Sequence, residues 1–289
     1  MVATIRNVLH ATRLFSHSPA RELANDPFTL RAREVWTAGD YDRVSRGFRH
    51  EAEVFVDRLG LTPADNVLDA ACGTGNLIIP AARTGARVTG LDLVPTLLEA
   101  AANRAYREGL DISLDEGTVE RLPYEKNEFD VVMSMFGVMF AARPERVVAE
   151  LRRVTRVGGR VALASWMPDS FVGQMLGIHA AYVPPAADVP SPLLWGNESV
   201  IHRRFDSDNW NVKTRVRTLT FRYPYTPGGT AKLFRTSYGP TVRVFESLDN
   251  EQRGLLAGEL IDHWTKHQRP GKRITEVDSN YLEVVAIRR

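Results

Sequence analysis

Short apolar runs alternate with amphipathic segments between residues 65 and 167. The runs have the length and composition of buried parallel strands, and the segments between them carry apolar residues at helical spacing. Strands are predicted at residues 66–70, 86–91, 112–115, 129–134 and 160–166, and helices at 49–59, 76–83, 95–108 and 143–156. Because strands and helices alternate at this spacing, we predict βαβ units and an α/β fold with a doubly wound, mostly parallel sheet.

Glycine residues mark the expected ends of several of these helices. Gly60 and Gly109 stand just after two of them, where a glycine commonly closes a helix. Gly158 and Gly159 are expected to end the helix at 143–156.

The regular alternation stops after residue 167. The next 45 residues contain five prolines and are expected to form a loop-rich insertion. A strand is then predicted at 212–223, helical structure at 230–267 and a last strand at 280–288, which gives a seven-stranded sheet. The predicted parts are an N-terminal lid segment (1–50), an α/β core (51–167), a lid insertion (168–212) and C-terminal strands with a helical insertion (213–289).

The first 21 residues carry Arg6, Arg13 and Arg21, and no acidic residue stands before Glu22. Their apolar residues fall roughly on one helical face. Two interpretations follow. The segment is a short helix packed over the main domain of a cytoplasmic protein, or it is an organellar transit peptide.

Composition narrows the class of protein. The chain has 289 residues, of which 44% are hydrophobic, and its 37 basic and 35 acidic residues give a net charge of +2. These values are typical of a globular protein and exclude a disordered chain or a coiled coil. The near-neutral charge argues against a nucleic-acid partner, and no apolar run approaches the ~18 residues of a membrane span. Cys72 is the single cysteine, which excludes an intramolecular disulfide and a cysteine-cluster zinc site.

A glycine-rich segment at residues 67–76 (VLDAACGTGN) follows the first predicted strand and opens a helix. Gly73 and Gly75 let the backbone approach a ligand without an intervening Cβ, and the start of the helix offers free N–H groups. Asp92 lies 17 residues past Gly75 at the end of the second strand, where a carboxylate can accept both hydroxyls of a ribose. The segment therefore suits a cofactor that contains a nucleoside.

Two further residues distinguish between such cofactors. The dinucleotide fingerprint requires a small residue three positions after Gly75, where this chain has Ile78. Asp69, at the end of the first strand, would repel a pyrophosphate but attract an ammonium group. S-adenosyl-L-methionine carries both a ribose and an ammonium group, so we predict it as the cofactor in place of NAD.

Residues 65–167 resemble the class I S-adenosylmethionine-dependent methyltransferases, and most of all the broad group of menaquinone and ubiquinone C-methyltransferases. The resemblance rests on the segment 67–76, on Phe-Asp-Val-Val at 129–132 and on Gly-Gly-Arg at 158–160. It implies a Rossmann-like methyltransferase fold whose lid is built from helices and loops.

The resemblance also implies roles for single residues. Asp69, Ala71 and Gly73 would line the methionine moiety, although many relatives have a glycine at the position of Ala71. Asp92 would hold the ribose, and Leu93 would lie against the adenine.

Adenine recognition departs from the family's pattern. Thr118 stands where the family has an aspartate that reaches the adenine amino group, so recognition would depend more on the Val119 backbone. Tyr41 lies in a segment like the family's N-terminal lid. The predicted cofactor set is completed by Gly75, Asn76 and Ser134.

Substrate contacts are expected mainly from aromatic residues outside the motif. The candidates are Trp36, Phe136, Phe140, His179, Trp195 and Tyr238. Each has a plainer alternative, because aromatic residues also pack in cores and a lone histidine usually lies in solvent. Cys72 is expected to pack in its loop rather than react. His179, His202 and Tyr182 are candidate bases, none is assigned a catalytic role, and no metal site is expected.

The sequence thus predicts an enzyme that transfers a methyl group by in-line displacement to a small, partly apolar or aromatic molecule. A protein or nucleic-acid methyltransferase and a non-catalytic cofactor-binding protein are the alternatives. The first lacks support, because residues 134–137 read Ser-Met-Phe-Gly where a motif of the Asn-Pro-Pro-Tyr type would stand. The accepting atom and the oligomeric state are left open.

Overall fold

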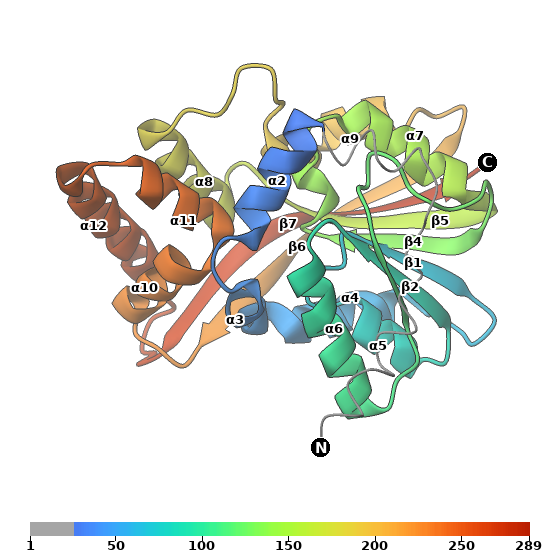
Figure 1. Cartoon of the computed structure of the whole chain (residues 1–289), viewed down its shortest axis with the longest axis horizontal. Coiled ribbons are helices and arrows are strands. Elements are labelled where there is room, and N and C mark those ends of the chain that lie inside the picture. Colours follow the sequence, from blue (N-terminus) through green and yellow to red (C-terminus); the bar gives the residue numbers. More distant parts are fainter. Residues whose placement is uncertain (1–25) are drawn as a thin grey trace.

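The computed structural model describes residues 26–289 and contains a seven-stranded sheet with helices on both faces (Figure 1). The strands are β1 (Asn66–Ala70), β2 (Arg87–Asp92), β3 (Ser113–Glu116), β4 (Phe129–Met135), β5 (Thr155–Trp166), β6 (Trp210–Tyr223) and β7 (Thr275–Arg288). Their order is β3-β2-β1-β4-β5-β7-β6, and β7 runs antiparallel to both of its neighbours. The predicted doubly wound, mostly parallel sheet is confirmed. The expectations for residues 1–21 lie outside the described part of the chain.

Four helices cover the parallel half of the sheet. They are α4 (Arg49–Leu59), α5 (Ile78–Arg83), α6 (Pro95–Glu108) and α7 (Pro144–Val154). In Figure 1, α4, α5 and α6 lie below the sheet and α7 lies above it. On α7, Val147, Leu151 and Val154 are fully buried at helical spacing, which defines the face that packs on the sheet. Helices on both faces leave the central strands no exposed side, which explains their continuous apolar runs.

The glycines near the helix ends have two different roles. Gly60 and Gly109 close α4 and α6 with φ angles of 58° and 65°, as predicted. Gly158 and Gly159 do not end α7, because β5 already begins at Thr155. They lie in a bulged part of β5, where Gly158 has a φ of 78° and a Cβ on Gly159 would lie 2.8 Å from the Asp130 carbonyl oxygen.

The strands β6 and β7 have 14 residues each and pair over their whole length. β5 pairs with β7 only between Tyr281 and Ile287. The start of β7 and the end of β6 therefore run past the carboxyl end of β5 as a two-stranded ribbon (Figure 1). This continuation explains why β7 begins at Thr275, earlier than the predicted start at 280.

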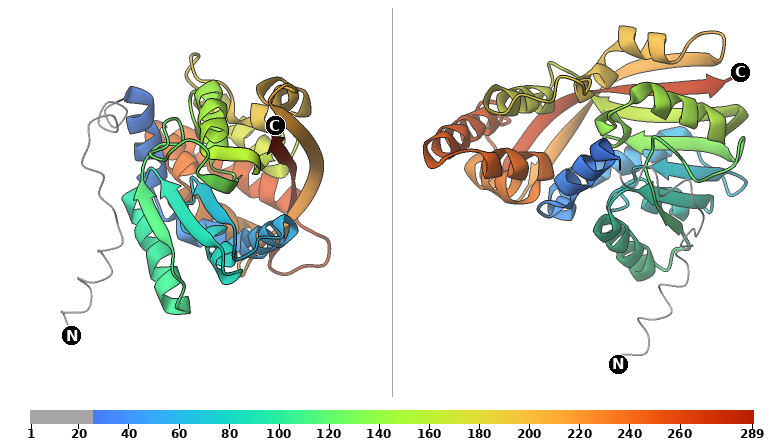
Figure 2. Two further views of the ribbon diagram at one scale, coloured as in Figure 1. Left: turned by 90° about the vertical axis from the view of Figure 1, so that its right-hand side faces the viewer. Right: turned by 45° about the horizontal axis from the view of Figure 1, so that its top comes forward.

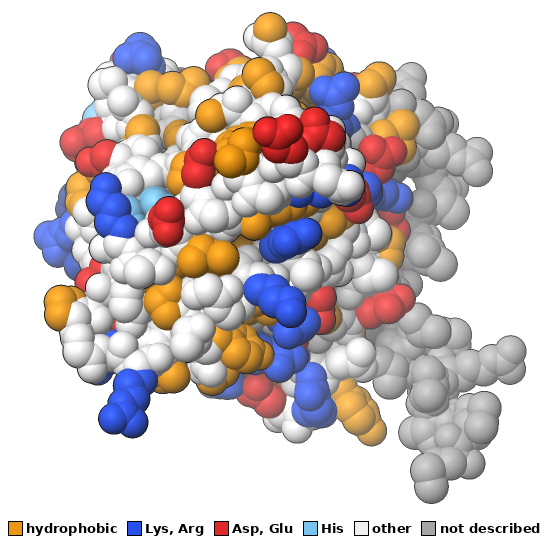
Figure 3. All heavy atoms as spheres, turned by 90° about the vertical axis from the view of Figure 1, so that its left-hand side faces the viewer, with side chains coloured by type: hydrophobic (Ala, Val, Ile, Leu, Met, Phe, Trp, Pro, Cys, Tyr) orange, Lys and Arg blue, Asp and Glu red, His pale blue; other side chains and the backbone are white. Residues whose placement is uncertain are grey.

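Four helices pack around this ribbon, and together with it they form what we call the helical cap. They are α8 (Phe171–Tyr182), α10 (Pro227–Ser237), α11 (Gly239–Ser247) and α12 (Asn250–Lys266). At its centre the Trp264 ring lies 4.5 Å from the Phe171 ring and 4.9 Å from the Phe234 ring. Phe221 brings β6 into the same aromatic cluster. Figure 3 looks onto the cap and shows hydrophobic side chains in small groups among charges of both signs.

The predicted lid insertion 168–212 divides into two parts. α8 belongs to the helical cap, whereas η4 (Pro192–Gly196) packs on β5, and α9 (Glu198–Arg204) packs on η4. Trp195 is 1% exposed beneath the Arg204 guanidinium, and Trp210 is 1% exposed beside Phe205. Both tryptophans are therefore core residues of the second part.

The N-terminal helices α2 (Pro27–Thr37) and α3 (Tyr41–Ser45) lie between the cap and the core (Figure 2, right). Asp26 begins α2, because its carboxylate accepts the Thr29 N–H at 3.0 Å. After α3 comes η2 (Arg46–Phe48), and the Tyr223 hydroxyl of β6 donates to the Val44 carbonyl of α3 at 2.6 Å. In the described part of the chain, no helix is long and apolar enough to cross a membrane.

Candidate cofactor and substrate site

A cavity of about 570 Å³ opens at the carboxyl ends of β1, β2 and β4, within the usual size range of small-molecule sites. It has two parts. The inner zone is formed by the loops that follow the strands, at residues 69–77, 91–97, 117–120 and 135–142. The outer zone is formed by α2, by residues 183–189 and by α11. In open α/β sheets, ligands bind at the carboxyl edge, at the point where the connections that follow two neighbouring strands run to opposite faces of the sheet.

The glycine-rich loop turns sharply between β1 and α5. Ala71, Gly73 and Gly75 all have positive φ angles, of 62°, 53° and 87°. A Cβ on Gly73 would lie 3.6 Å from the Tyr41 ring, and Gly73 faces the cavity. Gly75 does not line the cavity, since it packs against α6, where an added Cβ would lie 3.2 Å from the Ala101 Cβ. The two glycines thus serve ligand approach and helix packing respectively.

Asp92 links the ends of β1 and β2. Its Oδ2 accepts the Gly73 N–H at 2.7 Å, and its Oδ1 accepts the Val94 N–H at 3.0 Å. Burial raises the pKa of Asp92 to about 6, although these backbone hydrogen bonds oppose the shift. Each carboxylate oxygen keeps a further lone pair for a ligand hydroxyl.

Asp69 is 1% exposed, and its Oδ2 has no hydrogen-bond partner among the described residues. Burial and the nearby Asp92 both raise the pKa of this carboxyl well above its usual range. A buried acceptor without a donor is costly, and a cationic donor in the cavity would satisfy it. The ammonium group of S-adenosylmethionine is such a donor, so the residues present fit this cofactor.

The remaining inner wall suits a flat apolar ring. Leu93 and Val119 line it, and the Thr118 hydroxyl accepts the Glu120 N–H at 3.2 Å across a tight turn. The hydroxyl of Thr118 can still donate one hydrogen bond of its own.

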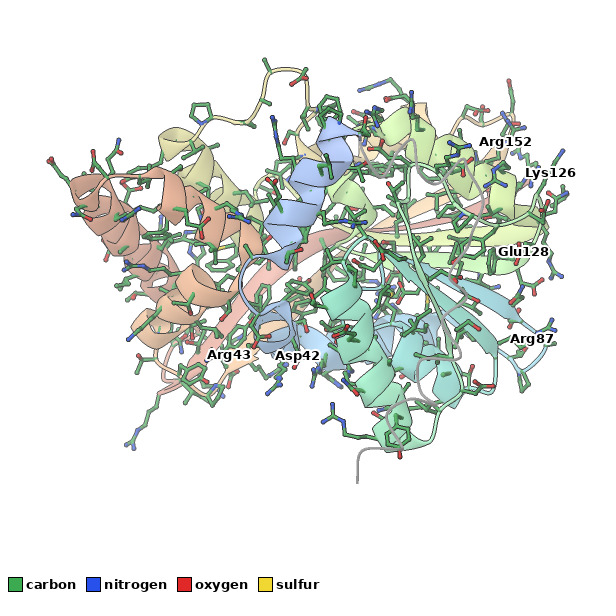
Figure 4. The ribbon with its side chains drawn as sticks, viewed as in Figure 1. Asp42, Arg43, Arg87, Lys126, Glu128 and Arg152 are labelled. Carbon is green, nitrogen blue, oxygen red and sulfur yellow. The ribbon has the colours of Figure 1, made fainter. Side chains whose placement is uncertain are left out.

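A hydrogen-bond network fixes α3 to the glycine-rich loop. The Ser45 and Thr74 hydroxyls lie 3.1 Å apart, and the Asn76 side chain donates to the Ser45 carbonyl at 3.2 Å. Arg104 of α6 donates to the Thr74 carbonyl at 2.6 Å. Figure 4 labels Asp42 on α3, next to α6. It also labels Arg87, Lys126, Glu128 and Arg152, which lie at the end of the sheet far from α3.

Aromatic rings enclose the passage between the two zones. The Trp36 ring lies 4.9 Å from Phe140, 5.4 Å from Tyr41 and 5.9 Å from Tyr238. Phe136 stacks on Trp166 at 3.5 Å. Phe136 also has a φ of 59°, a conformation that costs ~1–3 kcal/mol for a residue with a side chain and is typical of functional sites.

The structure brings most of the predicted cofactor residues to one cavity. Its lining includes Tyr41, Asp69, Ala71, Gly73, Asn76, Asp92, Leu93, Thr118 and Val119. Ser134 does not line it; its hydroxyl donates to the Ala70 carbonyl at 2.6 Å and so ties the end of β4 to β1.

Only some of the predicted substrate residues line the cavity. Trp36, Phe136 and Phe140 line the cavity, and Tyr238 lies behind them at an adjoining void of about 20 Å³. His179 and Trp195 do not line it. The His179 Nε2 faces the Thr241 hydroxyl at 3.3 Å, and burial lowers the pKa of His179 to about 4, so it is a neutral residue of the cap interior.

The structure also shows where the other candidate bases and Cys72 lie. His202 and Tyr182 lie away from the cavity, and the Tyr182 hydroxyl donates to Glu259 at 2.7 Å. Cys72 lines the cavity but is buried, and burial raises the pKa of its thiol, which keeps it protonated. Within residues 26–289, no three His, Cys, Asp or Glu side chains gather as a metal site.

Much of the outer zone was not predicted. Its walls include Phe28, Ala32 and Val35 of α2, Val183 to Val189 in the loop after α8, and Pro240 and Val244 of α11. The Asp-Pro pair at 26–27 does signal a helix start, so α2 itself could have been found from the sequence.

Comparisons with known proteins agree with this geometry. A family model described as a methyltransferase domain matches residues 68–163. An uncharacterized protein of Mycobacterium tuberculosis is 35% identical over 245 residues, which cover 84% of this chain and 88% of that protein. A ubiquinone/menaquinone biosynthesis C-methyltransferase of Bdellovibrio bacteriovorus is 36% identical over 154 residues, which cover 50% of this chain and 63% of that protein.

Solved structures share the fold. A putative methyltransferase from Bacillus halodurans superimposes with a TM-score of 0.59 at 15% identity, covering 83% of this chain and 98% of that chain. The YcgJ protein from Bacillus subtilis gives a TM-score of 0.57 at 17% identity, with the same two coverages. This chain belongs to the class I S-adenosylmethionine-dependent methyltransferases.

Proposed function

We propose that this protein transfers the methyl group of S-adenosylmethionine to a small, partly apolar or aromatic molecule that occupies the outer zone. The observation that carries the proposal is the pair of buried carboxylates in one cavity: Asp69 with an oxygen that lacks a donor, and Asp92 at the end of the next strand. A ligand with an ammonium group and a ribose diol satisfies both.

Each part of the inner zone has a distinct role in this proposal. Asp92 accepts the ribose hydroxyls, Asp69 accepts the ammonium group, and Val119 with Leu93 holds the adenine. When bound, the cofactor supplies an electrophilic methyl group on a sulfonium.

The aromatic passage supports the transfer itself. Trp36, Tyr41 and Phe140 exclude water from the meeting point of the two zones, and their ring faces favour a nearby cationic centre. In-line displacement gains most of its rate from holding the two reactants at a productive distance, which an enclosed cavity does.

The lining of the outer zone favours a small molecule over a protein or nucleic acid. Its side chains are mostly apolar, and helices from the N-terminal segment and the cap cover it. A cofactor-binding protein without catalysis would have the same inner zone, so transfer of tritium from labelled S-adenosylmethionine to extracted small molecules distinguishes that alternative.

Calorimetric titration tests the cofactor. S-adenosylhomocysteine should bind with micromolar affinity and NAD should not bind, because Asp69 repels a pyrophosphate. Asp69→Asn should weaken S-adenosylhomocysteine at least tenfold, since a neutral amide replaces the partner of the ammonium group. Equal binding of NAD to the wild-type protein would overturn the proposal.

A further inference from the structure

The charged residues that line the cavity are separated by sign. The carboxylates, Asp69, Asp92 and Glu120, all belong to the inner zone, where Glu120 is paired with Arg143 at 2.5 Å. The described residues contribute two basic side chains to the lining, Arg31 and Arg243, and both belong to the outer zone. A ligand that extends from the inner zone into the outer zone therefore has acidic groups near its inner end and guanidinium groups near its outer end.

The two arginines differ in what they already bind. Arg243 of α11 pairs with Glu246 at 2.7 Å and donates to the Glu34 carbonyl of α2 at 3.0 Å, which joins these two helices. The side chain of Arg31, on α2, makes no hydrogen bond or ion pair with any residue between 26 and 289. Its five N–H donors are thus available at the cavity wall.

Apolar side chains make up most of the remaining lining of the outer zone. They come from all three elements of the outer zone: Ala32 and Val35, Val183 and Val189, and Pro240 and Val244. These surfaces match an apolar chain or ring, and they offer it few polar partners along its length.

We propose that the outer zone selects substrates with an apolar body and an acidic group, a carboxylate or a phosphate, at the end away from the methyl acceptor. Arg31 holds the acidic group, and Arg243 adds a second positive charge beside it. A guanidinium binds either anion through paired hydrogen bonds. The inference rests on the proposed function, because it places the methyl acceptor at the inner end.

The charge separation also sets the direction of binding. An acidic group that entered first would approach Asp69 and Asp92, and the repulsion would be strong in a cavity that excludes water. The opposite orientation places the acid at Arg31 and leaves the apolar end at the aromatic passage. One arrangement of charges thereby determines both substrate class and orientation.

Calorimetric titration of three probes tests the proposal, with S-adenosylhomocysteine present at saturation. Octanoate, octyl phosphate and octan-1-ol share one chain and differ in their head groups. Both acids should bind at least tenfold more tightly than the alcohol, and their ratio shows which acid is preferred. In Arg31→Ala the three probes should bind within about twofold of one another.

Arg33→Ala is the control, because Arg33 lies on the same helix and carries the same charge but pairs with Glu116 at 2.5 Å and does not line the cavity. It should retain the preference for acids. Equal binding of alcohol and acids to the wild-type protein, or an unchanged preference in Arg31→Ala, would overturn the inference. If S-adenosylhomocysteine binds normally while the probes fail these tests, the proposed function still stands. If S-adenosylhomocysteine does not bind to the wild-type protein, that result refutes the proposed function and does not test the preference among the probes.

Discussion

Asp92 combines a structural role with the proposed binding role. Its two oxygens accept the Gly73 and Val94 backbone N–H groups, so the carboxylate holds the glycine-rich loop against the end of β2. Replacement by alanine would leave two N–H groups without acceptors, at about 1–3 kcal/mol for each group that stays buried. Asparagine keeps one acceptor oxygen and is therefore the better variant for separating binding from folding.

The affinity for S-adenosylhomocysteine should fall at low pH. Burial raises the pKa of Asp92 to about 6, and the ionised form is the better acceptor for ribose hydroxyls. Affinity should therefore drop about tenfold between pH 7.5 and pH 5, measured by calorimetry. Stability without ligand should change in the opposite sense, because a raised pKa means that the folded state binds more protons. This contribution is present below about pH 4 and is lost as the pH rises through about 6.

Asp92→Asn is the control for this pH dependence. Both the loss of affinity and the gain in stability at low pH should shrink in the variant, while Asp69, whose pKa is raised by burial and by Asp92, keeps a dependence of its own. An affinity that stays constant from pH 7.5 to pH 5 in the wild-type protein would show that Asp92 does not hold the ligand as an ionised group.

At the scale of elements, the covering of the cavity consists of fixed and free parts. α3 is tied to the glycine-rich loop through Ser45 and Asn76, and α8 is packed in the cap through Phe171. Residues 183–189 lie at the cavity wall, and among residues 26–289 they have no such anchors beyond the Val183 and Val189 backbone bonds. α2 contacts the cavity along one side and is held by Arg243, by the Asp26–Arg143 pair and by the Arg33–Glu116 pair.

Hydrogen exchange should therefore slow at α2 and at residues 183–189 when S-adenosylhomocysteine and octanoate are added together. The ligands would add contacts on the sides of α2 and of residues 183–189 that line the cavity, whereas α8, η4 and α9 do not line it and should barely change. The measurement is exchange followed by mass spectrometry. Uniform slowing across all of 168–212, or none at α2, would contradict this division between fixed and free parts.

The sequence predicted the parallel core well because its signals are local. The strand at 66–70 and the helix at 95–108 have the predicted bounds, since apolar runs and a closing glycine define them. Asp69, Asp92 and Gly73 were found because one loop and the next strand end determine where they lie. Arg31 and Arg243 were missed because they meet at the cavity only through the packing of α2 on α11, which no local pattern encodes.

At the scale of the whole molecule, the ribbon of β6 and β7 joins two regions, the sheet and the cap, through one continuous hydrophobic core in which Phe221 contacts both Trp166 and Trp264. The sheet buries Val67, Leu68 and Val132 against α4 to α7, and the cap buries its own aromatic cluster around Trp264. The cavity lies where these regions meet, so its inner zone belongs to the sheet and part of its outer zone to the cap. The shape of the inner zone thereby depends on the packing of the sheet, and the shape of the outer zone depends also on the packing of the cap.

Replacement of Trp264 should separate the two regions. The side chain is fully buried and contacts rings from α8, α10 and β6, so Trp264→Ala should cost about 3–5 kcal/mol, and mostly within the cap. Trp264→Phe should cost less, because the indole N–H has no hydrogen-bond partner within residues 26–289 to lose. Calorimetric melting of Trp264→Ala should show the cap unfolding before the sheet, with β1 and β4 amides still protected.

Trp195→Ala is the matched control, since it removes a buried tryptophan beside β5 and should lower the melting temperature of the sheet itself. One shared transition in Trp264→Ala, with cap and sheet amides losing protection together, would mean that the continuous core couples the cap to the sheet too strongly for the cap to open alone.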